Sequence, residues 1–121
     1  MPFPEGFHER GYCLLLLKAL CGPHQAPRLW NEKFSRTLQS MGLKQAGDEP
    51  CLFVNDWLII FFFVDDVIAL YHRKTRHRWE AFKQRLFQVY EFKDMGEIKW
   101  FKDQAVATRL GSWMQFLPGK E

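Results

Sequence analysis

The feature that most constrains this chain is an apolar run, Trp57–Val64, that stops at two adjacent aspartates, Asp65 and Asp66, before Val67–Tyr71 resumes the apolar character. Successive side chains of a strand point to opposite faces, so a run without alternation predicts a strand that is buried on both faces. If the strand continued through the pair, one carboxylate would be buried without a partner, at a cost on the order of several kcal/mol. The sequence therefore predicts a tight turn at the pair, between two buried strands.

Two readings of the aspartate pair are open at this point. Aspartate is a favoured turn residue, so Asp65 and Asp66 could simply be solvated. Alternatively, two carboxylates at the tip of a rigid hairpin offer hard oxygen ligands to a divalent metal ion. Two adjacent aspartates rarely complete such a site, so the second reading requires a further carboxylate from elsewhere.

Other apolar patterns predict the elements around this hairpin. Tyr12–Lys18 is an apolar run short enough for a buried strand, and Cys51–Val54 predicts a short strand that leads into a two-residue turn at Asn55-Asp56. Helical spacing predicts two amphipathic helices. The first begins near Pro27, ends near Gly42 and carries Trp30, Phe34, Leu38 and Met41; the second has a basic outer face and carries Trp79, Phe82, Leu86 and Val89.

Gly96 then predicts a turn, and Glu97–Phe101 a last short strand. The order strand, helix, three strands, helix, strand predicts an α+β fold, in which an antiparallel sheet has helices packed on one face. The 121 residues are 47% hydrophobic and 26% charged, which is typical of one globular domain.

The cysteines and the apolar runs indicate the compartment. Cys13, Cys21 and Cys51 are odd in number and lack the paired spacing of a zinc site, which favours reduced thiols in an intracellular protein of the cytoplasm or the nucleus. The longest apolar run is far shorter than the roughly 20 residues that a membrane-spanning helix requires. We therefore expect a soluble protein with no membrane partner.

A basic segment follows the apolar strands, with Glu80 as its one opposing charge. Its cations are Arg73, Lys74, Arg76, Arg78, Lys83 and Arg85. Such a helix face is usually just solvated, but it also suits sequence-independent contact with a nucleic-acid phosphate backbone. For that role the candidates are Arg73, Lys74, Arg76 and Arg78.

Four motifs, in order over Pro4 to Phe101, resemble those of Ty1/copia-type retrotransposon reverse transcriptases. Phe63-Val64-Asp65-Asp66 resembles their YVDD box, with Phe where Tyr is usual. The segment from Lys18 to Trp30 resembles KALYGLKQAPRxW, and the segment from Pro4 to Phe7 matches PEGF. The segment from Glu91 to Phe101 is similar to FxMKDLGELKYF. This ordered set favours the metal-site reading of the aspartates.

The resemblance implies part of the palm and fingers of a right-hand polymerase that copies RNA and DNA into DNA. Asp65 and Asp66 would be catalytic ligands of two Mg²⁺ (or Mn²⁺) ions, with Asp65 the more direct ligand. Gln25 would lie near the incoming nucleotide and the template, and Phe63 and Val64 beside the primer terminus.

The resemblance also implies partners and a further site region. A template-primer of RNA or DNA, a deoxynucleoside triphosphate and the remaining segments of a polyprotein would be the partners. The turn at Asp94-Met95-Gly96 would belong to the region that supports the primer.

Several departures from the family pattern carry expectations of their own. The family's upstream D-V-x-T-A-F-L segment, with a further catalytic aspartate, is not found before PEGF, so we expect little or no polymerase activity from this chain alone. The lost strand is also expected to leave an exposed edge beside the hairpin formed by Trp57–Val64. Cys21-Gly22-Pro23-His24 replaces Tyr-Gly-Leu-Lys, and Lys102-Asp103-Gln104 puts charge where the family has an apolar strand.

We therefore divide the chain into a partial Ty1/copia-type reverse transcriptase domain at 1–101 and a divergent, unassigned tail at 102–121. The alternatives to an enzyme fragment are a decayed transposon remnant and a non-catalytic nucleic-acid-binding module that uses the basic helix.

Overall fold

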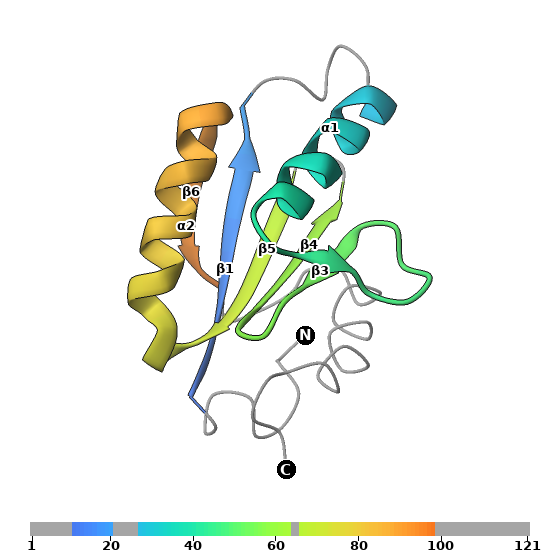
Figure 1. Cartoon of the computed structure of the whole chain (residues 1–121). Helices are drawn as coiled ribbons and strands as arrows, with labels where there is room; N and C mark the ends of the chain where they lie inside the picture. Colours follow the sequence, from blue (N-terminus) through green and yellow to red (C-terminus); the bar gives the residue numbers. More distant parts are fainter. Residues whose placement is uncertain (1–10, 21–26, 64–65, 99–121) are drawn as a thin grey trace.

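The computed structural model of the chain describes residues 11–20, 27–63 and 66–98. Within these ranges six strands form one antiparallel sheet in the order β2-β3-β4-β5-β1-β6, and both helices lie against one of its faces (Figure 1). The elements are β1 (Tyr12–Ala19), α1 (Pro27–Ser40), β2 (Lys44–Gln45), β3 (Leu52–Val54), β4 (Leu58–Phe63), β5 (Asp66–His72), the 3-10 turn η1 (Arg73–Thr75), α2 (Arg76–Val89) and β6 (Phe92–Glu97). The predicted α+β class, with helices on one face of an antiparallel sheet, is confirmed.

The central strand β4 is buried on both of its faces, as its lack of alternation predicted. Leu58, Ile60 and Phe62 belong to the hydrophobic cluster under the helices. Ile59 and Phe61 belong to a second cluster on the opposite face. All five are at most 2% exposed, and burial of a side chain of this size contributes roughly 1.5–3 kcal/mol. This strand therefore fixes the middle of the sheet.

The two helices bury their apolar stripes against the same sheet face. The buried members are Trp30, Phe34 and Leu38 of α1 and Trp79, Phe82 and Leu86 of α2. Phe34 meets Phe62 edge to face, with ring centroids 5.0 Å apart, and Trp79 stacks on Tyr71 at 5.5 Å. The predicted stripe of the second helix is wrong at one position, because Val89 ends α2 and is 55% exposed.

The turn before β4 is displaced from its predicted centre. The sequence predicted that Asn55 and Asp56 form the middle of the turn, but Asn55 is the first residue of the turn. The Asn55 side-chain oxygen accepts hydrogen bonds from the backbone N–H of Trp57 (2.8 Å) and of Leu58 (2.7 Å). Its own backbone N–H donates to the Leu58 carbonyl at 3.0 Å. This side-chain capping shifts the turn to Asp56-Trp57, so that β4 begins at Leu58.

The last predicted strand was also misplaced. Gly96 lies inside β6, not at a turn, and the range predicted as a strand, Glu97–Phe101, contributes only its first residue to β6. The pairing of β6 with β1 shifts between Leu16 and Leu17, so Met95 is an extra residue of a β-bulge. Gly96 adopts φ 84°, which glycine tolerates at a bulge as readily as at a turn. The rest of the predicted strand, from residue 99 on, lies outside the described residues.

The expected open edge beside the central hairpin is wrong. β1 pairs along β5 from Tyr12 opposite His72 to Lys18 opposite Asp66, and β3 pairs with the other side of β4. The edge strands of the described sheet are the two-residue β2, which was not predicted, and β6. No helix in the described ranges is long and apolar enough to cross a membrane.

Phe34→Ala tests the helix-face core. Phe34 is 0% exposed and contacts several aromatic rings, so we expect the free energy of unfolding to fall by about 3–5 kcal/mol. Urea unfolding followed by circular dichroism would measure the change. Leu29→Ala on the same helix is the matched control, because Leu29 is 64% exposed and should change stability by less than about 0.5 kcal/mol. Equal losses in the two variants would contradict the assigned packing.

Candidate active site

The candidate site is built around the end of the β4–β5 hairpin. β4 ends at Phe63 and β5 begins at Asp66, and these two residues are opposite each other in the ladder. The two predicted strands are therefore confirmed, but the predicted turn is wrong at Asp66, which belongs to β5. Val64 and Asp65 lie outside the described residues. The Asp66 side chain is 37% exposed. The apolar strands thus deliver one carboxylate to the solvent at the end of the sheet.

A lysine that was assigned no role in the sequence lies directly across from this carboxylate. Lys18 Nζ donates a hydrogen bond to Asp66 Oδ1 at 3.1 Å. By strand alternation both side chains lie on the sheet face opposite the helices, with Leu14 and Leu70. Both are more than a third exposed, so solvent screens the pair and its net contribution to stability is between zero and about 1 kcal/mol. In the sequence, the one feature that could have drawn attention to Lys18 is its charge at the end of an apolar run.

The residues of the described ranges do not by themselves complete a metal site. No group of three or more histidine, cysteine or acidic side chains there could hold a metal ion. Asp66 supplies an oxygen ligand of the kind that Mg²⁺ prefers, but its cross-strand neighbour is the Lys18 ammonium. The two ions implied by the resemblance remain a prediction.

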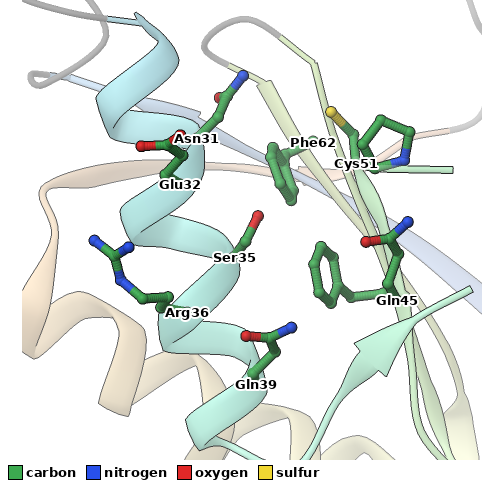
Figure 2. A pocket seen from close by; sticks show the side chains of 10 residues that line it. Asn31, Glu32, Ser35, Arg36, Gln39, Gln45, Cys51 and Phe62 are labelled. Carbon is green, nitrogen blue, oxygen red and sulfur yellow. The ribbon is translucent and has the colours of Figure 1, made fainter.

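A groove runs between α1 and the strands β2, β3 and β4, with a volume of about 540 Å³. Figure 2 shows α1 side chains along one wall and Phe62, Cys51 and Gln45 on the other side. Its described lining residues are Asn31, Glu32, Ser35, Arg36, Gln39, Gln45, Pro50, Cys51, Phe53 and Phe62. The groove opens on the helix face, whereas Asp66 belongs to the other face, and Glu32 is the one carboxylate in this lining. The groove therefore does not supply the missing ligand.

The predicted nucleotide-proximal residues are only partly placed. Gln25 lies outside the described residues, although α1 begins at Pro27, as predicted from the tolerance of a first helical turn for proline. The Phe63 backbone belongs to β4.

The basic residues lie at the other end of the sheet from Asp66. Arg73 and Lys74 form part of η1, Arg76 and Arg78 begin α2, and all four are exposed. β5 separates them from Asp66 by about 20 Å, at roughly 3.3 Å per residue. Arg76 also donates to Cys13 Sγ at 3.8 Å, which raises the pKa of its guanidinium. The structure thus does not bring the basic residues together with the acidic end.

The predicted primer-supporting segment contains an ion pair that joins β6 to α2. Lys83 Nζ lies 2.9 Å from Asp94 Oδ2 and 3.2 Å from Glu80 Oε1. The Gly96 backbone N–H donates to Asp94 Oδ1 at 2.9 Å. Burial alone would raise the pKa of Asp94, but the hydrogen bonds from Lys83 and Gly96 outweigh it and lower that pKa. Asp94 therefore holds the bulge and the helix together as a carboxylate.

Comparison with known proteins defines the class of this chain. A family model described as Reverse transcriptase (RNA-dependent DNA polymerase) matches residues 1–113, so the match continues beyond Phe101. The chain belongs to the reverse transcriptase family. Its resemblance to the Ty1/copia type, noted from the four motifs, is confirmed by transposon relatives.

Two of these relatives are similar over most of the chain. The retrovirus-related Pol polyprotein from transposon TNT 1-94 of Nicotiana tabacum is 30% identical over an alignment of 104 residues, and the match covers 79% of this chain and 8% of that protein. A transposon Ty5-1 protein of Saccharomyces cerevisiae is 30% identical over an alignment of 105 residues, and the match covers 81% of this chain and 33% of that protein. The chain thus spans a minor part of each relative's length. No solved structure matches it.

Lys18→Gln tests the cross-strand pair. We expect the free energy of unfolding to change by less than about 1 kcal/mol, because both partners are exposed. Urea unfolding at low and high salt would measure it, and Asp66→Asn should give a loss of similar size. A loss of several kcal/mol in either variant would show that the pair is more buried than described.

The Lys83–Asp94 pair predicts a pH dependence of stability. The pKa of Asp94 is lower in the folded chain than in the unfolded chain, where it is about 3.9. The pair therefore stabilises the fold above that value, and the contribution disappears as the pH falls through the lower, folded-state pKa. We expect Asp94→Asn to destabilise the chain at pH 6 by less than about 1 kcal/mol, because the side chain is 32% exposed. The deficit should shrink toward pH 3.

Urea midpoints between pH 3 and pH 6 would measure this dependence. Asp48→Asn is the control, since it removes an exposed carboxylate that forms no ion pair with a described residue. A deficit that is the same in both variants, or that does not depend on pH, would contradict the role assigned to Asp94.

Proposed function

We propose that this chain is part of the palm of a retrotransposon reverse transcriptase, which makes DNA on an RNA or DNA template. The observation that carries the proposal is the hairpin of β4 and β5. Strands buried on both faces end at a solvent-accessible aspartate, in a chain that belongs to the reverse transcriptase family. Rigid strands of this kind are the support that a precisely placed catalytic carboxylate requires.

In the proposed reaction a primer 3′-hydroxyl attacks the α-phosphate of a deoxynucleoside triphosphate and pyrophosphate leaves. Asp65 and Asp66 are the proposed carboxylates for Mg²⁺ or Mn²⁺, whose charge would stabilise the reacting oxygens. Lys18 occupies the position across from Asp66, so we propose that the remaining ligand comes from another segment of the polyprotein. Gln25, Phe63 and Val64 are the proposed neighbours of the nucleotide and the primer end.

Primer extension tests whether the chain completes its own site. We expect no extension of a primed RNA or DNA template in Mg²⁺ or Mn²⁺ by the chain alone, because the described residues contain no group of three or more histidine, cysteine or acidic side chains that could hold a metal ion. The variants Asp65→Asn and Asp66→Asn are assayed in parallel as controls. Extension by the unaltered chain that either substitution abolishes would show that the site is complete.

A chimaera tests the proposed function itself. In it this chain replaces the matching segment of the tobacco transposon polyprotein, which supplies the surrounding segments. Extension that is lost in Asp66→Asn is the expected result. A chimaera that is soluble and binds template-primer, yet does not extend it, would contradict the proposal.

The remote basic end supports a second candidate, a nucleic-acid contact outside the catalytic hairpin. Arg73, Lys74 and Arg78 are exposed and form no ion pair with a described residue. Contact with phosphates would make binding weaken with salt in proportion to the number of phosphates neutralised.

A further inference from the structure

A second, smaller groove lies at the end of the sheet opposite Asp66. It has a volume of about 270 Å³ and lies between α2 and the turn that joins β3 to β4. We call it the Trp57 groove; it is lined by Met41, Asn55, Trp57, Arg78, Ala81, Phe82 and Arg85. In Figure 1 the β3–β4 turn and the beginning of α2 lie at the same end of the sheet. β4, with six residues at about 3.3 Å each, places this end about 20 Å from the hairpin tip.

Among the described residues, the charge in this groove is positive and uncompensated. Arg78 and Arg85 are two helical turns apart on one side of α2, about 10 Å along the axis. Both are exposed, and neither forms an ion pair or hydrogen bond with a described residue. Lys83 differs from them, because it is held by Glu80 and Asp94. No carboxylate occurs in the described lining, so the groove suits an anionic ligand.

Trp57 supplies the groove with a fixed aromatic ring. It meets Phe82 at right angles, with ring centroids 6.1 Å apart and an interplanar angle of 87°. Asn55 fixes the backbone of the turn through its hydrogen bonds to Trp57 and Leu58. Trp57 is only half-buried, whereas Trp30 and Trp79 are 6% and 0% exposed. Trp57 therefore packs against the edge of the core and leaves part of its indole open to a ligand.

We propose that the Trp57 groove binds an unpaired nucleotide of a single-stranded nucleic acid. Its base packs on Trp57, and its flanking phosphates contact Arg78 and Arg85. Aromatic stacking combined with cations along the backbone is the usual way that proteins hold single strands without sequence preference. A duplex suits this groove less well, because its bases stay stacked inside the double helix. An acidic peptide also suits it less well, because it lacks a flat ring beside each charge. The inference does not require the β4–β5 hairpin to be catalytic.

Binding of a labelled oligothymidylate of about 12 nucleotides tests the proposal. Fluorescence anisotropy is measured with the full chain in EDTA, so polymerisation plays no part. We expect Arg78→Gln with Arg85→Gln to weaken binding about tenfold or more. The matched control is Lys44→Gln with Lys93→Gln, which removes the same charge from exposed positions on the two edge strands and should weaken binding less than about threefold.

Trp57→Leu tests the stacking contact and should weaken binding about fivefold or more. An abasic oligomer of the same length should bind the unaltered chain more weakly and should not respond to Trp57→Leu. A thermal melt checks that each variant is folded. If the Trp57→Leu variant does not fold, the double arginine variant still tests the proposal, because both arginines are exposed.

Five results would overturn the proposal, of which four come from the binding measurements themselves. These four are equal weakening by the two charge-matched double variants, equal affinity for duplex and single strand, equal affinity for the abasic oligomer, and absence of binding at low salt. Competition by polyglutamate as strong as that by the oligonucleotide would also overturn it, because the groove would then recognise charge alone.

Discussion

Burial of β4 on both faces is the constraint on which the rest of the structure depends. A strand with apolar side chains on both sides must have a partner strand on each edge and cover over each surface. The pairing with β3 and β5 and the packing of Phe34 on Phe62 meet part of this requirement. The strand cannot continue into two charges, so it has to end where the aspartates begin. The position of Asp66 at the accessible end of the sheet follows from that burial.

The length of the central strands separates two kinds of surface. At one end Asp66 offers a hard oxygen ligand beside Lys18. At the other end Arg78 and Arg85 stand beside an indole, without acidic partners among the described residues. Carboxylates and uncompensated guanidinium groups at one place would neutralise each other. In the proposed functions, their separation along β4 and β5 assigns them to different parts of a nucleic-acid ligand.

Local patterns predicted most of this fold, and non-local contacts account for what they missed. The apolar runs and the helical stripes fixed β1, α1, β4, β5 and α2, because their periodicity depends only on near neighbours. The turn at Asn55 was displaced by one residue, since a side-chain hydrogen bond chose its position. Gly96 was misread as a turn because positive φ serves a bulge equally well. The setting of Asp66 between two apolar runs made it a candidate ligand, but its partner Lys18 lies 48 residues earlier in the chain, and only the strand order reveals that pair.

Lys18 has a consequence that does not depend on the strength of its ion pair. Leu14–Leu17 is apolar on both faces of β1, so sliding this strand by one residue along β5 would exchange one leucine for another at most positions. Sliding would also turn every side chain of β1 to the opposite face of the sheet. The Lys18 ammonium would then point into the aromatic cluster of the helix face, where Trp30 and Phe34 offer it no acceptor. An exposed lysine of small energetic value thus selects one alignment of two strands that hydrophobicity alone would leave ambiguous.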